Sequence, residues 1–158
     1  MAASKQKDRS QPAWATGALV LPDGEVFWGR GIGVSSASVG EVCFNTSLTG
    51  YQEIMTDPSY AGQIINFTFP HIGNVGANDE DIETNSPAAR GCVLRADITE
   101  PSNWRAVHHL DVWLKSMDMV GIAGVDTRRL TRHIRDAGAP NGAIVHQPDS
   151  PINTATLR

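Results

Sequence analysis

Cysteine is scarce in this sequence: Cys43 and Cys92 are the only two among 158 residues, and no C-x-x-C pattern joins them. Such sparse, widely spaced thiols are typical of a protein kept reduced in the cytoplasm, rather than of a disulfide-stabilised secreted domain. The glycosylation sequons that begin at Asn45 and Asn66 then carry no function, because glycosylation requires a secreted chain. The sequence therefore predicts a soluble, cytoplasmic protein.

Long apolar runs and an excess of basic charge are missing as well. The longest apolar run, Val120–Val125, is far shorter than the roughly 20 residues that span a bilayer. The net charge is −4, so no overall positive field would attract nucleic acid or an anionic membrane. Residues 1–15 are polar and lack the apolar core of a signal peptide, which predicts a disordered tail. We therefore expect no nucleic-acid partner and no membrane association.

What the sequence does contain is a series of short strands. Its length fits one domain, and 15 glycines and 9 prolines predict many turns. We interpret Gly29–Gly33 as a flexible strand end and His71–Arg90 as a long loop. Alternating or short apolar runs predict strands at Ala18–Leu21, Glu25–Trp28, Glu41–Asn45, Gln63–Phe69, Cys92–Arg95, Val120–Val125 and Ala143–His146.

Two amphipathic helices are expected among the later strands. Ser102 would cap the first, and Asp126 would cap the second, which would end at Gly138. The apolar positions are Val107, Leu110, Leu114 and Met117 in the first helix, and Leu130, Ile134 and Ala137 in the second. Strands and helices in this order predict a layered α/β (mixed α+β) domain. Ser150-Pro151 has the pattern of a further helix start, yet few residues follow it, so we interpret the chain as a fragment.

No catalytic or metal-binding constellation can be assembled from the residues. His108 and His109 are neighbours on a helix and point about 100° apart, so they cannot hold one ion together. Neither cysteine lies in a glycine-flanked elbow or precedes a His-x-Glu pair. A free-standing enzyme that uses Cys43 or Cys92 with His71 is the weaker alternative. The sequence predicts no catalytic residue, no metal site and no cofactor bound by this domain.

Basic side chains gather in the second expected helix, at Arg128, Arg129, Arg132 and Arg135. The favoured interpretation is an exposed helix flank, and the alternative is a docking face for a partner or a bound anion. On that alternative the chain would be a stand-alone protein-interaction domain without a catalytic role.

Two long stretches resemble one known family. GEVCFNTSLTGYQEIMTDPSYAGQIINFTFPHIGNVGAND, residues 40–79, closely resembles the amino-terminal domain of the small chain of carbamoyl-phosphate synthase. GIAGVDTRRLTRHIRDAGAPNGAI, residues 121–144, matches a second block of that family in the right place. The opening hairpin fits too, so the resemblance covers nearly everything after the polar tail. These are long collinear strings, and chance agreement would not produce them.

The resemblance implies a role within a two-subunit ligase. In this family a second domain of the small chain is a glutaminase with a Cys, His and Glu triad, and it releases ammonia from glutamine. The large subunit, with ATP and Mg, converts ammonia and bicarbonate to carbamoyl phosphate for arginine and pyrimidine biosynthesis. The implied fold is a three-layer β/β/α domain of the swivelling type. On this basis residues 1–15 are a tail, 16–148 the amino-terminal domain, and 149–158 the start of a linker to a glutaminase domain absent here.

The resemblance also assigns one site residue. The serine of Asp-Pro-Ser-Tyr reaches the glutamine site of the neighbouring domain in the family, so Ser59 is the predicted glutamine-binding residue. From the residues alone, the Ser59 hydroxyl would instead bond to the backbone of its own turn. For Asn45, Thr46, Ser47 and Thr49 we expect the structural role, in which their polar groups satisfy turn backbone at a domain interface. The chain by itself is expected to be inactive, with the large subunit and its own glutaminase domain as partners.

Overall fold

The computed structural model describes residues 10–48, 50–69, 88–95 and 110–158. Residues 110–116 are helical, and they precede β6. The remaining elements, in chain order, are β1 (Gly17–Val20), β2 (Val26–Gly33), β3 (Ala37–Asn45), α1 (Tyr51–Thr56), the 3-10 helix η1 (Pro58–Tyr60), β4 (Gln63–Phe67), β5 (Gly91–Val93), β6 (Val120–Ala123), α3 (Thr127–Ala137), β7 (Asn141–His146) and the 3-10 helix η3 (Thr154–Leu157).

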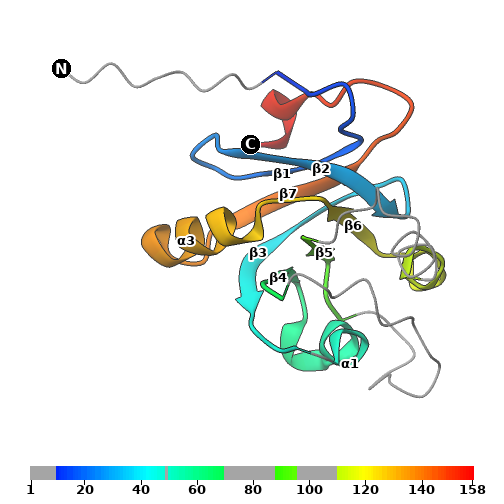
Figure 1. Ribbon diagram of the computed structural model, residues 1–158, viewed down its shortest axis with the longest axis vertical. Helices are drawn as coiled ribbons and strands as arrows, with labels where there is room; N and C mark the ends of the chain where they lie inside the picture. The colour runs from blue at the N-terminus through cyan, green and yellow to red at the C-terminus, as the bar shows by residue number, and fades with distance from the viewer. Residues whose placement is uncertain (1–9, 49, 70–87, 96–109) are drawn as a thin grey trace.

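The strands close into one barrel in the order β1-β2-β6-β5-β4-β3-β7 (Figure 1). Strands β3, β4, β5 and β6 pair in parallel, so their carboxyl ends lie at one rim. The ladders β1–β2, β1–β7, β2–β6 and β3–β7 are antiparallel. The predicted mixed α/β class is confirmed, and it takes the form of a closed barrel; the three-layer description stays a prediction.

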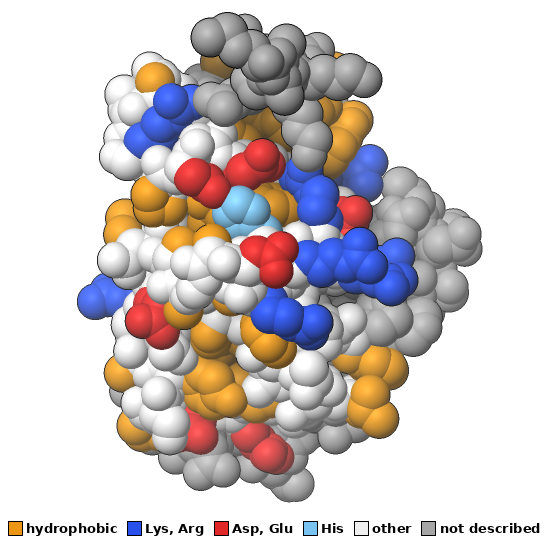
Figure 2. All heavy atoms as spheres, turned by 90° about the vertical axis from the view of Figure 1, so that its left-hand side faces the viewer, with side chains coloured by type: hydrophobic (Ala, Val, Ile, Leu, Met, Phe, Trp, Pro, Cys, Tyr) orange, Lys and Arg blue, Asp and Glu red, His pale blue; other side chains and the backbone are white. Residues whose placement is uncertain are grey.

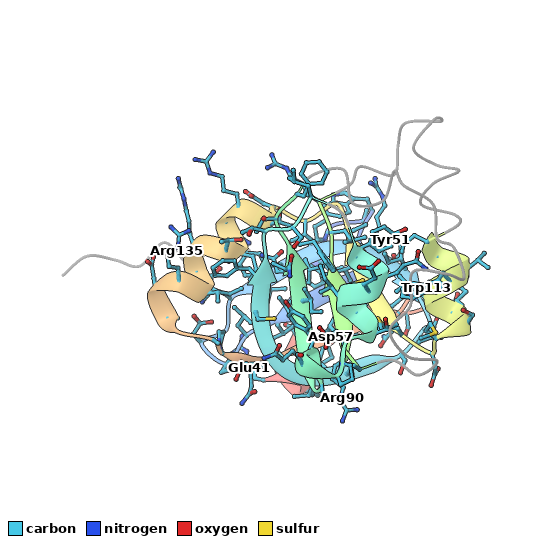
Figure 3. All side chains as sticks on the ribbon, turned by 90° about the horizontal axis from the view of Figure 1, so that it is seen from below. Glu41, Tyr51, Asp57, Arg90, Trp113 and Arg135 are labelled. Carbon is cyan, nitrogen blue, oxygen red and sulfur yellow. The ribbon has the colours of Figure 1, made fainter. Side chains whose placement is uncertain are left out.

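Alternation along the strands divides the apolar side chains between two large clusters. Ile64 of β4 joins the cluster that includes Leu130 and Ile134 of α3. Its neighbours Ile65 and Phe67 join the other cluster, which also holds residues of α1 and of helical residues 110–116. Because successive strand residues point to opposite faces, β4 packs towards α3 through Ile64 and towards the other helices through Ile65 and Phe67. In Figure 3, Tyr51 of α1 and Trp113, both in that second cluster, lie on the same side of the barrel.

Several predictions made from the sequence are confirmed residue by residue. The Asp126 carboxylate caps α3 by accepting a hydrogen bond from the Arg129 N–H (3.1 Å), and Gly138, with φ of 78°, ends the helix. Ser102 and Val107 of the other expected helix lie outside the described residues, as does most of the expected loop His71–Arg90.

Three details were predicted wrongly. Gly29–Gly33 is not a loose strand end, because β2 continues through it and pairs with β6, with Arg30 opposite Ala123. A Cβ at Gly31 would overlap the ring of His146, so close packing requires this glycine. Ala137 is exposed rather than on the inner face of α3. After Ser150 no α-helix begins; the short η3 starts later, with Asn153 as its cap.

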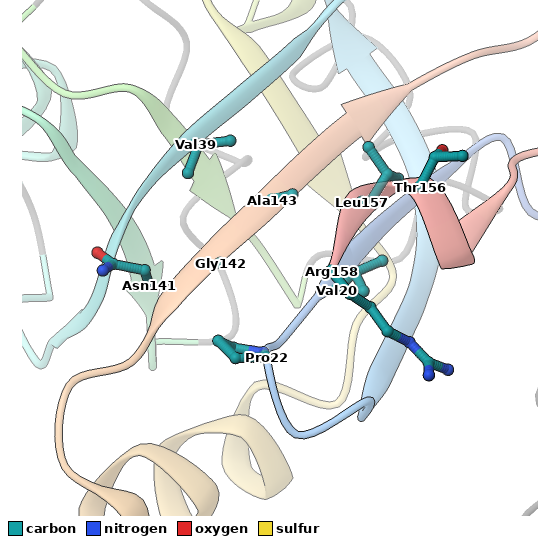
Figure 4. A pocket seen from close by; sticks show the side chains of 9 residues that line it. All are labelled: Val20, Pro22, Val39, Asn141, Gly142, Ala143, Thr156, Leu157 and Arg158. Carbon is teal, nitrogen blue, oxygen red and sulfur yellow. The ribbon is translucent and has the colours of Figure 1, made fainter.

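The last residues pack against the outside of the barrel. Ile152 is buried in a third apolar cluster with Val20 and Val145, and its N–H donates to the Gln11 Oε1 (2.8 Å). Beside it lies a hollow of about 260 Å³, between η3 and strands β1, β3 and β7 (Figure 4). Within the described ranges, no helix combines the length and apolar character that a bilayer span needs.

Candidate functional site

The neutral stretch from Phe44 to Tyr60 links two parallel neighbours, β3 and β4, through α1 and η1. Gly50, whose φ is 81°, makes the turn into α1, a backbone region that glycine adopts without strain. Two of its polar residues, Gln52 and Thr56, are buried, and the Thr56 hydroxyl donates to the Gln52 carbonyl (2.8 Å). Thr46, Ser47, Glu53 and Ser59 are exposed. Burial therefore explains the absence of charge only at Gln52 and Thr56, where an ionised side chain would be costly.

Ser59 lies at the surface in the turn that joins α1 to β4. The Asp57 carboxylate accepts hydrogen bonds from both the N–H (2.9 Å) and the hydroxyl (2.8 Å) of Ser59. These bonds, the backbone one foremost, hold the pKa of Asp57 below its ordinary value. Asp57 is therefore ionised at neutral pH and has no proton to give, so the Ser59 hydroxyl is the donor. Because Ser59 is exposed, the lone pairs of its hydroxyl remain available as acceptors.

Sequence reasoning did not find Asp57. The Asp-x-Ser spacing was a usable signal, since Asp side chains often bond to the backbone two residues on. It also changes the interpretation of Ser59, whose hydroxyl bonds to a carboxylate rather than to turn backbone. The assignment of Ser59 to glutamine stays a prediction.

Asn45, near the start of the same stretch, is hydrogen-bonded to Tyr60 at its end. Its amide Nδ2 donates to the Tyr60 hydroxyl (3.0 Å), while its Oδ1 accepts from the Ser47 N–H (2.8 Å). Its backbone carbonyl accepts from the Thr68 N–H (3.0 Å). The expected contact of the Asn45 side chain with turn backbone is thus confirmed, while its place at a domain interface stays a prediction. Thr49 lies outside the described residues. Leu48, beside this network, is 64% exposed, so an apolar side chain stands free at the edge of the site.

The two cysteines are poor nucleophiles. The Cys43 thiol donates to the Gln63 Oε1 (3.5 Å), and its pKa is raised first by burial and then by the Glu41 charge. Complete burial raises the pKa of Cys92 to about 12. Since the thiolate is the reactive form, neither is activated at neutral pH. His71, the partner considered for them, lies outside the described residues. The described residues also hold no cluster of three or more His, Cys, Asp or Glu suited to a metal ion.

The arginines of α3 divide into two kinds. The Arg129 guanidinium lies 4.2 Å from the Phe27 ring centroid, bonds to the Val26 carbonyl (3.4 Å) and approaches Glu25 (3.8 Å). Arg128, Arg132 and Arg135 are exposed, and their side chains make no hydrogen bond or ion pair among the described residues. Figure 2, which views the side of the molecule where α3 lies, shows Lys and Arg side chains gathered on this surface. Figure 3 shows Arg135 well away from Asp57.

Comparison with known proteins gives consistent results. The family model for the carbamoyl-phosphate synthase small chain, CPSase domain, matches residues 19–144. The carbamoyl phosphate synthase small chains of Mesorhizobium japonicum and Rhizobium meliloti are each 57% identical over 155 residues, which is 93% of this chain and 39% of theirs. That of Zymomonas mobilis is 57% identical over 139 residues, covering 88% of this chain and 37% of its own.

This chain therefore spans about two fifths of the length of the curated relatives that it matches. Among solved structures, a subtilisin-like protease from Pseudoalteromonas sp. AS-11 aligns at 11% identity with a TM-score of 0.43, over 85% of this chain and 33% of its own. So weak a likeness carries no argument. The sequence matches, in contrast, are collinear with the barrel from β1 to β7. The chain belongs to the carbamoyl-phosphate synthase small chain family.

Proposed function

We propose that this chain is the amino-terminal domain of the small, glutamine amidotransferase subunit of carbamoyl-phosphate synthase. The family match across residues 19–144 is the observation that carries the proposal. In the whole cytoplasmic enzyme, the glutaminase domain of the small subunit releases ammonia, and the large subunit uses it with ATP, Mg and bicarbonate. The product serves arginine and pyrimidine biosynthesis. By itself the chain is catalytically inactive, which agrees with its two unactivated thiols.

The domain has two tasks in this proposal: it docks onto the large subunit, and it supplies one contact to glutamine. The exposed Ser59 hydroxyl provides that contact. Because its hydrogen is directed at Asp57, its free lone pairs suit an N–H donor of glutamine, in the amide or the α-ammonium group. The swivelling-type, three-layer arrangement is the family fold that we propose for the barrel with its covering helices.

A chimera tests the glutamine contact. Residues 1–158 replace the matching part of the Mesorhizobium japonicum small chain, and the product is purified with the large chain of that organism. With Ser59→Ala, loss of one hydrogen bond of about 0.5–1.5 kcal/mol should raise the KM for glutamine roughly twofold to tenfold. Turnover should be unchanged if the bond is equally strong in the ground and transition states. Synthesis from added ammonia should be unaffected.

Ser47→Ala is the matched control, since Ser47 is exposed in the same stretch and only its backbone N–H bonds to Asn45. Ser47→Ala should change neither the KM for glutamine nor the turnover number. A purely structural Ser59 would give the opposite result, with a lower melting temperature for Ser59→Ala and an unchanged KM for glutamine. A chimera that fails to co-purify with the large chain would count against the docking task.

A further inference from the structure

A second hollow lies at the carboxyl ends of β5 and β6, with a volume of about 480 Å³. Its lining residues are Trp14, Arg30, Arg95, Gly124, Val125 and Asp126. This volume falls within the range of roughly 300–1,000 Å³ that is usual for small-molecule sites. The carboxyl ends of parallel strands are also where α/β sheets commonly bind ligands.

Pairing of the strands brings two arginines to this hollow from either side of β6. Arg30 of β2 lies opposite Ala123, the last residue of β6. On the other side, Val93 of β5 pairs with Ile122, and Arg95 follows two residues later. Arg30 and Arg95 are 65 positions apart in the sequence (95 − 30). The pairing of the strands in the closed barrel brings them to the same pocket.

Arg95 is the available cation of this pocket. Arg95 is exposed and, within the part of the chain that the structure describes, makes no hydrogen bond or ion pair. Asp126 is the acidic member of the lining, and its Oδ1 accepts from the Arg129 N–H at the start of α3 (3.1 Å). The carboxylate of the lining is thus bonded to a helix N-terminus, where a negative charge is stabilised, and among the described residues it forms no ion pair with Arg95.

Trp14 gives the pocket an apolar wall with a defined position. The Arg30 guanidinium lies 5.5 Å from the Trp14 ring centroid, which is within cation–π range. The indole nevertheless stays 47% exposed. A guanidinium fork matches the oxygens of a phosphate or carboxylate, and an adjacent exposed ring offers contact area to an apolar group.

We propose that this pocket binds a small molecule with a phosphate or carboxylate group, held by Arg95 and Arg30, and an apolar part in contact with Trp14. The proposal is independent of the glutamine contact, because neither Ser59 nor any other residue of its turn lines the pocket. It also differs from general attraction of anions, since the chain as a whole carries a net charge of −4.

Titration calorimetry on the 158-residue chain tests this site, after circular dichroism has verified that the chain is folded. The probes are phenyl phosphate, benzoate, inorganic phosphate and, as a neutral control, phenol. We expect saturable binding of phenyl phosphate or benzoate and none of phenol, and the better of the two anions identifies the charged group. Arg95→Gln should weaken binding at least about tenfold, because it removes a charge-assisted hydrogen bond. Trp14→Ala should weaken the aromatic anion more than inorganic phosphate.

Arg132→Gln is the matched control, because it removes the same charge from an exposed arginine of α3 outside the pocket. It should leave the affinity unchanged. If Arg95→Gln does not fold, Arg95→Lys keeps the charge but loses the bidentate geometry, and it should still bind more weakly. The proposal is overturned if none of the anions binds saturably at tens of millimolar. Equal losses for Arg95→Gln and Arg132→Gln would overturn it as well, since they would indicate non-specific charge attraction.

Discussion

The turn segment Phe44–Tyr60 and the helix α3 use polar side chains in opposite ways. In the turn segment, Asn45 and Asp57 bond to neighbours within the same stretch. On α3, Arg128, Arg132 and Arg135 extend from the surface without a partner among the described residues. Polar groups that bond to one another fix the shape of a site. Polar groups left unpaired add little to stability but remain available to another molecule.

Substitution of Asn45 should show the largest stability difference between the two regions. Asn45→Ala removes two side-chain hydrogen bonds and leaves the Tyr60 hydroxyl and the Ser47 N–H without that partner. We expect a loss of about 1–3 kcal/mol in the free energy of unfolding, measured by urea titration. Arg132→Ala should change it by less than about 0.5 kcal/mol. Equal effects for these two variants would remove the distinction between the regions.

A smaller difference is expected within α3 itself. Arg129 stacks on Phe27 and bonds to the Val26 carbonyl, so Arg129→Ala should cost about 0.5–1 kcal/mol. Arg128→Ala, one residue earlier on the exposed face, is the control and should cost less than Arg129→Ala in the same titration. If Arg128→Ala were the more damaging, α3 would have to be held by contacts other than those of Arg129.

The smallest effect should come from the pH dependence of Asp57. Its pKa is lower in the folded chain than the ordinary value, so the unfolded state binds the proton more readily. The stabilisation is therefore fully present above the ordinary pKa and is lost as the pH falls through the lowered folded value. Melting temperatures from pH 7 to pH 2 should fall less steeply for Asp57→Asn than for the unaltered chain. Parallel curves would show that Ser59 does not stabilise the ionised carboxylate.

Local patterns predicted the strands and α3 because their signals lie within a few residues, but they did not predict α1. The Asp126 cap and the Gly138 end of α3 are examples, as are the shared faces of Ile65 and Phe67. What the sequence could not show depends on distant pairing. Gly31 is packed against His146, which is 115 positions later in the sequence (146 − 31). From the residues of β2 alone, the glycines therefore indicated a flexible strand end. In the same way Arg30 and Arg95 carried no local signal of a shared pocket, while Ser59 was assigned through the family resemblance alone.

The position of β7 has a consequence for how the chain folds. It is the last strand of the barrel in chain order, yet it pairs with the first strand, β1, and with β3. The barrel therefore cannot close during synthesis until residues 141–146 have left the ribosome. Until then, β1 and β3 each have one edge without its partner strand. Contacts so far apart in sequence slow folding, and exposed strand edges favour aggregation. Truncation before residue 141 should consequently yield an aggregation-prone intermediate rather than a smaller stable domain.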